Sequence, residues 1–345
     1  MKAIQLTATG KPGTFLYTEL PSPRPKPDET LIAVEFCGLN HLDLWMEAGG
    51  LPIPQTLPRI PGGEIAGTIV QTGPQAGEWK IGDRVAVQSN LFCGHCEFCA
   101  QGEESMCLNG ILLGVQRDGG FAEQVAVPAR ALVRIPNEVP TRDSAALTLA
   151  GSTAMRMLTK RAQVNPGDWV LVMAGASGVG SAAIQIARGL GARVISTGSS
   201  ESKRALAVSL GAEYVVDPGL PDWPKTVRLL TGKRGVNLVI EHIGGEVLKN
   251  CFECLARGGT IVTCGATAGS EAALDLWPFF VKQQRLVGSY GRNRADIQAT
   301  LEWAAAGKLK PVIDSVFPLK QTPGAFAKLR SRIALGKMVV EARAN

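Results

Sequence analysis

The stretch Trp169-Val170-Leu171-Val172-Met173-Ala174-Gly175-Ala176-Ser177-Gly178-Val179-Gly180 decides the fold class of this chain. Its five leading apolar residues predict a buried strand, a glycine-rich loop follows, and the spacing over 181–190 predicts a helix. Glycines let a backbone approach a pyrophosphate, and a helix N-terminus offers it N–H groups. We therefore predict a dinucleotide-binding loop, with an ordinary strand–helix turn as the alternative. The residues predicted to contact the cofactor are Gly175, Ser177, Gly178, Val179 and Gly180.

Outward from this loop, apolar runs alternate with helical patterns from Gly151 to about residue 290. Such alternation is typical of a parallel sheet with helices on both faces, so we predict a doubly wound nucleotide-binding domain over 151–290. The preceding residues combine short strand patterns with turn residues and predict a β-rich domain over 1–150. The strands predicted in the second domain are 169–174, 193–197, 214–216, 238–240, 260–264 and 285–289; its clearest helices are 181–190 and 203–210.

The residues after the second predicted strand bear on the choice of cofactor. An NAD site usually has an acidic residue roughly 20 positions beyond the first glycine, where it binds the adenosine ribose. Here that position falls within Ser196–Ser200, which contains no acid, and Lys203 and Arg204 follow. Hydroxyl groups and cations suit a 2′-phosphate, so we predict NADP(H) bound by Ser199, Lys203 and Arg204. The alternative is that the two cations are solvated helix residues, and Glu201 favours that alternative.

Four cysteines form a C-x2-C-x2-C-x7-C run: Cys93, Cys96, Cys99 and Cys107. Four thiolates at this spacing can close a tetrahedron around zinc, which leaves no open coordination position for a substrate. The pattern predicts one structural zinc ion per subunit, in a lobe near 90–110. Scattered free thiols are the alternative. Cys251 and Cys254, one helical turn apart, are predicted to be packing residues.

Composition excludes several classes of function. The 345 residues carry a formal net charge of +6, but the Lys and Arg residues are scattered along the sequence, so a nucleic-acid partner is not expected. No apolar run reaches the roughly 18 to 20 residues that span a bilayer, and the first residues have no signal-peptide pattern. We predict a cytoplasmic protein that acts on a small molecule, without a membrane partner.

Together these features resemble the medium-chain dehydrogenase/reductase superfamily, which includes zinc alcohol dehydrogenases and quinone oxidoreductases. The resemblance also rests on Gly82-Asp83-Arg84-Val85, Gly119–Glu123 and Val287-Gly288-Ser289-Tyr290. It implies a GroES-like catalytic domain built from 1–150 and the C-terminal segment 291–345, with the Rossmann domain between them. It also implies a homodimer formed through the edge of the nucleotide-domain sheet, with a tetramer as the alternative.

The chain departs from the pattern of the zinc alcohol dehydrogenases where their catalytic metal is bound. Asn40 replaces the first cysteine ligand and Gly63 replaces the histidine ligand, while the third ligand position falls near Leu149. A rescue through Cys37 and His41 is conceivable, although Cys37 aligns with a cysteine that is not a ligand. We therefore predict that the catalytic zinc is absent and that the structural zinc remains.

Without a metal, hydride transfer to a quinone or to an activated alkene or carbonyl is easier than hydride removal from an alcohol. Hydrogen bonds alone can stabilise the delocalised anion that forms from such an acceptor. The prediction is an NADP(H)-dependent oxidoreductase for such acceptors. The resemblance implies that Asn40 borders the substrate, Thr153 the nicotinamide and His41 the pyrophosphate; a structural amide and a surface histidine are the alternatives for Asn40 and His41. A zinc-dependent alcohol dehydrogenase and a non-catalytic, crystallin-like NADPH-binding protein are the alternative functions.

Overall fold

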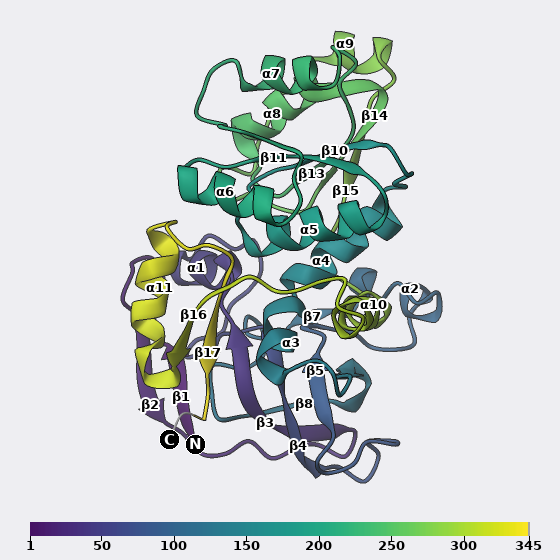
Figure 1. Cartoon of the computed structure of the whole chain (residues 1–345). Helices are drawn as coiled ribbons and strands as arrows, with labels where there is room; N and C mark the ends of the chain where they lie inside the picture. The colour runs from purple at the N-terminus through teal and green to yellow at the C-terminus, as the bar shows by residue number, and fades with distance from the viewer. Residues whose placement is uncertain (344–345) are drawn as a thin grey trace. The chain divides into compact units, whose positions relative to one another are not determined.

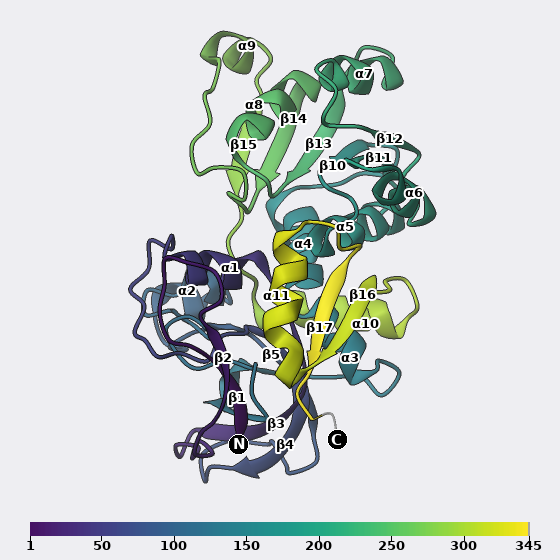
Figure 2. The ribbon, with the colours of Figure 1, turned by 90° about the vertical axis from the view of Figure 1, so that its left-hand side faces the viewer.

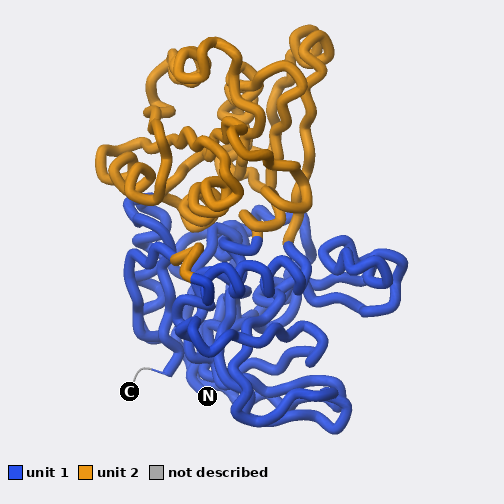
Figure 3. Tube along the Cα trace, turned by 45° about the vertical axis from the view of Figure 1, so that its right-hand side comes forward, with its two compact units in different colours: residues 1–152, 292–306, 311–345 blue, residues 153–291, 307–310 orange. Residues whose placement is uncertain are grey.

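The computed structural model describes residues 1–343, and the chain forms two compact units (Figure 3). Unit 1 contains 1–152, 292–306 and the residues from 311 onward, whereas unit 2 contains 153–291 and 307–310. The segment 307–310 thus belongs to unit 2, although the predicted division assigned every residue after 290 to the first domain. Residues 344–345, the end of the predicted C-terminal segment, lie outside the described residues.

Six parallel strands form the sheet of unit 2, in the order β12-β11-β10-β13-β14-β15 (Figure 2; Figure 1 shows the chain turned by 90°). This order is that of a doubly wound nucleotide-binding fold, in which the chain starts in the middle and reverses direction at the first strand. The predicted fold class and all six predicted strands are confirmed. The strands are β10 (Trp169–Val172), β11 (Arg193–Thr197), β12 (Tyr214–Val216), β13 (Val236–Glu241), β14 (Leu255–Thr263) and β15 (Arg285–Gly288).

Five helices connect these strands: α5 (Gly178–Gly189), α6 (Glu201–Ser209), α7 (Trp223–Leu230), α8 (Gly245–Cys254) and α9 (Leu276–Val281). Helix α5 begins three residues before the predicted start because the Ser177 hydroxyl caps it, and Ser200 caps α6 in the same way. Side chains such as Leu171, Val239 and Cys251 are fully buried between helices and sheet. Burial of each large aliphatic side chain stabilises the unit by about 1.5–3 kcal/mol.

Unit 1 is built around a mostly antiparallel sheet, in which the last two strands of the chain pair in parallel and the last strand pairs with one from near the N-terminus (Figure 2). The C-terminal strand β17 (Lys337–Glu341) pairs with β3 (Glu29–Gly38), so residues just over 300 positions apart in sequence, such as Val339 and Gly38, lie side by side. The remaining strands are β1 (Lys2–Leu6), β2 (Phe15–Glu19), β4 (Glu64–Thr72), β5 (Arg84–Val87), β6 (Asn90–Leu91), β7 (Ile111–Leu112), β8 (Gln124–Pro128), β9 (Leu132–Arg134) and β16 (Ile313–Pro318).

The helices of unit 1 differ in length, and the one at Thr141–Leu147 packs against β3, β4 and β17 of the sheet. They are α1 (His41–Ala48), α2 (Glu97–Ala100), α3 (Thr141–Leu147), α10 (Arg294–Ala305) and α11 (Thr322–Arg330); the boundary between the units falls within α4 (Ala150–Arg156). Phe121 and Phe326 pack edge to face at the centre of the core. Within residues 1–343, no helix has the length and apolar character needed to cross a membrane.

Candidate functional site

The dinucleotide loop predicted from the sequence joins β10 to α5, and its glycines are required by close packing. A Cβ at Gly180 would lie 2.2 Å from the Ala174 carbonyl oxygen, and one at Gly175 would lie 2.1 Å from the Ser196 hydroxyl. Ser177 accepts a hydrogen bond from the Gly180 N–H at 2.9 Å. The loop therefore holds the first turn of the helix against the end of the strand, with the remaining N–H groups at a helix N-terminus suited to a phosphate.

His242 lies beside this loop and was not identified from the sequence. It follows β13, the neighbour of β10 at the point where the strand order reverses, which is where doubly wound sheets bind their ligands. Its Nε2 lies 3.0 Å from the Ser177 hydroxyl. Burial lowers the pKa of His242 to about 4, so the ring is neutral at pH 7. Its Nδ1 is buried and finds no hydrogen-bond partner within residues 1–343.

The three residues predicted to bind a 2′-phosphate lie together at the carboxyl end of β11. Ser199 is exposed, and Lys203 Nζ lies 3.4 Å from its hydroxyl. Arg204 instead donates to the Gly198 carbonyl at 3.0 Å and to the Asp217 carboxylate at 2.9 Å. The Arg204 charge is therefore partly balanced by Asp217, and the Lys203 ammonium lies beside the exposed Ser199 hydroxyl.

In unit 1 a buried ion pair lies next to Asn40, between β4 and the C-terminal strand. Lys337 Nζ is 2.6 Å from Glu64 Oε2, and the two side chains are 7% and 0% exposed. The same ammonium donates to the Asn40 side-chain oxygen at 2.8 Å and to the Leu39 carbonyl. Glu64 Oε1 accepts the backbone N–H groups of residues 149 and 150. Every charge of the pair is hydrogen-bonded, as buried ions require.

This cluster does not fit a catalytic zinc ion. Zinc in proteins prefers thiolate and imidazole ligands, and the positions that the resemblance assigns to the ligands hold Asn40 and Gly63, with the third near Leu149. A Cβ at Gly63 would lie 3.1 Å from the Leu113 carbonyl oxygen, so the backbone is packed tightly where a histidine would have to stand. Cys37 is fully buried, and burial raises the pKa of its thiol. The conceivable rescue by Cys37 and His41 gains no support from this geometry.

The residues predicted to border the substrate, the pyrophosphate and the nicotinamide have different surroundings. The Asn40 amide nitrogen donates to Gly38 and Glu64, at 3.3 and 3.1 Å. With Lys337 on its oxygen, the amide is held within unit 1, which favours the alternative of a structural amide. His41 is the first residue of α1 and is partly buried. Thr153 lies in α4, largely buried, at the start of unit 2.

The four cysteines predicted to bind zinc converge in a small lobe between β6 and β7. Sulfurs at about 2.3 Å from a tetrahedral zinc ion lie about 3.8 Å apart. The measured Sγ–Sγ distances are 3.5 Å for Cys107–Cys93 and Cys96–Cys99, and 3.9 Å for Cys93–Cys99 and Cys96–Cys107. Backbone N–H groups of Cys93 and Cys96 point at sulfurs of the set. Among residues 1–343 this is the only group of three or more His, Cys, Asp or Glu side chains that could hold a metal ion.

His95, inside the lobe, contributes no ligand. Its Nδ1 lies 3.1 Å from the Cys93 carbonyl oxygen, and the ring is exposed. With four thiolates the coordination shell of zinc is complete. The lobe therefore fits a structural zinc ion, which would hold its loop in place.

Comparison with known proteins identifies the family. Residues 26–137 match the model of the alcohol dehydrogenase GroES-like domain, and residues 178–306 match that of zinc-binding dehydrogenases. An alcohol dehydrogenase of Geobacillus stearothermophilus is 30% identical over 343 residues, covering 99% of both chains. The solved structure of an NAD-dependent alcohol dehydrogenase is 36% identical with a TM-score of 0.93, again over 99% of both. A mycobacterial quinone oxidoreductase is 28% identical with a TM-score of 0.80, over 99% of both chains.

Two units, a dinucleotide loop and a four-cysteine lobe define a two-domain oxidoreductase. The chain belongs to the medium-chain dehydrogenase/reductase superfamily, with its GroES-like and nucleotide-binding domains. The relatives include proteins named as alcohol dehydrogenases and one named as a quinone oxidoreductase.

Proposed function

We propose that this oxidoreductase transfers hydride from NADPH to a quinone or an activated alkene or carbonyl, without a catalytic metal ion. The observation that carries the proposal is the cluster of Asn40, Glu64 and Lys337. Where zinc alcohol dehydrogenases bind their catalytic metal, this chain has an amide, a glycine and a leucine, and the nearby carboxylate is neutralised by an ammonium group.

The charge balance of this cluster limits the chemistry. Because Lys337 and Glu64 form a neutral pair whose donors and acceptors are all used, they supply neither a strong electrophile nor a free base. A metal lowers the pKa of an alcohol and polarises a carbonyl, and this cluster has no equivalent. Acceptors that delocalise the added electrons need only hydrogen bonds and correct orientation.

The bound nicotinamide would supply the hydride, and the residues of this chain would hold the dinucleotide. We propose that the loop Gly175–Gly180 binds the pyrophosphate and that Ser199 and Lys203 contact the 2′-phosphate of NADPH. The absence of an acid from 196–200 and the position of Lys203 Nζ beside the Ser199 hydroxyl support this choice. Asn40 and Thr153 remain proposals for the substrate and nicotinamide, as does His41 for the pyrophosphate.

The test is a pair of assays on the zinc-loaded protein. We expect NADPH oxidation with a benzoquinone or a cyclic enone to continue in the presence of a zinc chelator that leaves the fold intact, as judged by circular dichroism. We also expect NADPH to bind more tightly than NADH. The variant Ser199→Asp is expected to reverse that preference, because the new carboxylate repels the 2′-phosphate of NADPH and can bind the ribose hydroxyl of NADH. Equal affinity for both cofactors in the unmodified protein would remove the NADP(H) assignment.

Alcohol oxidation is the second candidate, since the curated relatives that match the chain are named alcohol dehydrogenases. Alcohol-dependent reduction of NAD or NADP that disappears on chelation would favour it over the metal-free reductase. Tight NADPH binding without turnover of any quinone, enone or alcohol would instead favour a non-catalytic role.

A further inference from the structure

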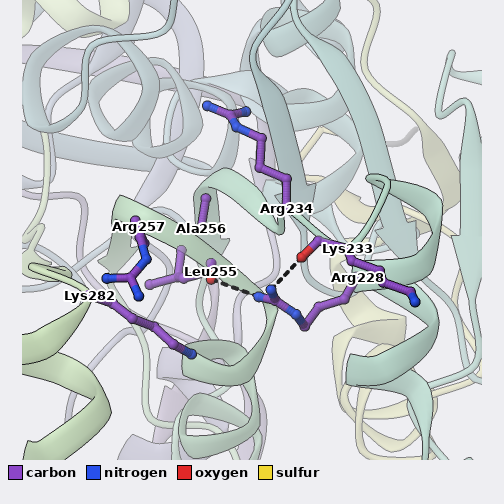
Figure 4. Close-up of a pocket in the computed structure, with 7 residues that line it drawn as sticks. All are labelled: Arg228, Lys233, Arg234, Leu255, Ala256, Arg257 and Lys282. Carbon is purple, nitrogen blue, oxygen red and sulfur yellow. Dashed lines mark hydrogen bonds between the residues drawn. The ribbon is translucent and has the colours of Figure 1, made fainter.

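A cavity of about 460 Å³ in unit 2 is surrounded by cations (Figure 4). It is lined by Arg228, Lys233, Arg234, Leu255, Ala256, Arg257 and Lys282. Arg228 lies in α7, and the other residues lie just before β13, at the start of β14 and just before β15, which is the amino edge of the parallel sheet. The dinucleotide loop follows the carboxyl end of β10, at the opposite edge. The cavity is therefore separate from the proposed cofactor site.

The fold holds the walls of this cavity in place. Gly235 has a φ of +90°, and a Cβ there would lie 2.7 Å from the Ala256 nitrogen, so only glycine lets the loop pack against β14. The Arg228 guanidinium donates to the carbonyls of Leu255, at 3.2 Å, and Lys233. It thereby ties the loop after α7 to the start of β14, as the dashed lines in Figure 4 show.

Arg257 and Lys282 add two more cations to this group. Arg257 donates to the Val281 carbonyl at 3.1 Å, next to Lys282. In Figure 4 the side chains of Arg257 and Lys282 lie on one side of Leu255, and those of Arg228 and Lys233 on the other. Backbone carbonyls thus position the guanidinium groups of Arg228 and Arg257. Each guanidinium has five N–H donors, and these contacts use only some of them.

Within the part of the chain that the structure describes, the positive charge of the cavity is not balanced by ion pairs. None of the five cations forms an ion pair with a carboxylate of residues 1–343. On the same unit, by contrast, Lys225 and Lys249 pair with Asp222 and Glu246. Like charges gathered without a partner raise the local potential and attract anions. The sequence did not reveal the cluster because its members are scattered over 228–282.

We propose that this cavity binds a small polyanion that carries two or more linked phosphate groups. Guanidinium groups recognise phosphate oxygens with paired hydrogen bonds, and several cations match a ligand with several charges. The volume falls within the range of about 300–1,000 Å³ typical of small-molecule sites. Only Leu255 and Ala256 are apolar, and no aromatic ring lines the cavity to stack on a base. The chemistry therefore favours a condensed phosphate over a nucleic acid.

The experiment is calorimetric titration of the zinc-loaded, full-length protein with tripolyphosphate at low ionic strength. We expect one ligand per subunit and much weaker binding of inorganic phosphate. The double variant Lys233→Gln/Lys282→Gln is expected to weaken tripolyphosphate binding by about tenfold or more, which corresponds to about 1.4 kcal/mol or more. The Arg228 guanidinium donates to the backbone carbonyls of Leu255 and Lys233, so the variant retains these contacts.

The matched control is Lys225→Gln/Lys249→Gln, which removes the same charge from the same unit outside the cavity. Its affinity for tripolyphosphate is expected to stay within about twofold of the unmodified protein. Equal losses in both double variants would mean non-specific charge attraction and would overturn the site, as would the absence of binding. Tighter binding of a short single-stranded oligonucleotide, lost in Lys233→Gln/Lys282→Gln, would overturn the assignment to a small ligand.

Discussion

At the scale of single residues, the ion pair of Lys337 and Glu64 is a buried charged contact that lies next to Asn40. A buried ion pair adds little net stability, since desolvation of both charges offsets their attraction, but removal of one partner leaves an uncompensated charge. Here the ammonium also holds the Asn40 amide, so its loss would disturb the segment that leads into α1.

Lys337→Met is therefore expected to lower the free energy of unfolding by about 3–5 kcal/mol, because it leaves the Glu64 carboxylate buried without its cation. Urea denaturation of the zinc-loaded protein measures this change. The control Lys225→Met removes an exposed cation and is expected to change stability by less than about 0.5 kcal/mol. A loss below 1 kcal/mol for Lys337→Met would contradict a buried, paired cation.

A second prediction concerns the pH dependence of stability and rests on His242. In the unfolded chain this ring takes up a proton below about pH 6.5, whereas the folded ring stays neutral until about pH 4. The unfolded state then binds more protons between these values, so stability falls as the pH falls through this window. His242→Gln keeps a partner for Ser177 and does not titrate. From pH 7 to 5 the free energy of unfolding of the unmodified protein is expected to fall by about 2 kcal/mol more than that of this variant. Urea denaturation at both pH values measures the difference, and equal losses in the two proteins would show that the pKa of the folded ring is not lowered.

The sequence predicted a functional residue where its partners lie close to it along the chain, and missed it where they lie far away. The zinc lobe was predictable because its four ligands lie within 15 consecutive positions and their spacing alone specifies the chemistry. Lys337 and Asn40 are 297 positions apart, and His242 and Ser177 are 65 apart. No local pattern links such pairs. From the sequence alone, Lys337 is a cation beside an apolar run and His242 is a histidine after another, and neither position indicates a partner.

At the scale of secondary structure, the strands of unit 2 were predictable because parallel strands buried on both faces form continuous apolar runs. Helix starts were less accurate. The hydrophobic spacing marks only the buried face of α5 and α6, whereas Ser177 and Ser200 set where each helix begins. The cap is part of the dinucleotide loop in α5, so the start of this helix and the proposed binding site depend on the same serine.

Close packing at this helix start gives a third prediction. Gly180→Ala is expected to weaken NADPH binding by about tenfold or more and to lower stability by about 1–3 kcal/mol, because the new methyl group would clash with the Ala174 carbonyl. Fluorescence titration and urea denaturation measure the two effects. Gly324→Ala in α11 meets open space and should leave binding unchanged. Normal NADPH affinity in Gly180→Ala would separate this loop from the cofactor.

At the scale of the whole molecule, β15 is the edge strand of the unit 2 sheet and has no partner on its outer side among the described strands. Large apolar side chains are exposed on and beside it: Leu276, Trp277, Phe280, Val281, Leu286 and Tyr290. An open strand edge next to such a surface favours association. A second copy of the chain would extend the sheet across a twofold axis, in line with the homodimer implied by the resemblance.

We therefore expect a dimer in light scattering, and expect Phe280→Glu to shift it to monomer at micromolar concentration by placing a charge in the contact. Ile333→Glu alters an apolar residue of unit 1 that is also more than half exposed, and this variant should remain dimeric. A monomer in the unmodified protein, or a dimer that survives Phe280→Glu, would remove the edge of β15 as the interface.

The central claim is that one metal site persists and the other is lost, and zinc content measures both at once. Elemental analysis of the purified, tag-free protein should give one zinc ion per subunit, and none after the cysteines of the lobe are replaced by serine. Two zinc ions per subunit would contradict the metal-free active site and direct attention to alcohols as substrates. No zinc in the unmodified protein would contradict the assignment of Cys93, Cys96, Cys99 and Cys107 as its ligands.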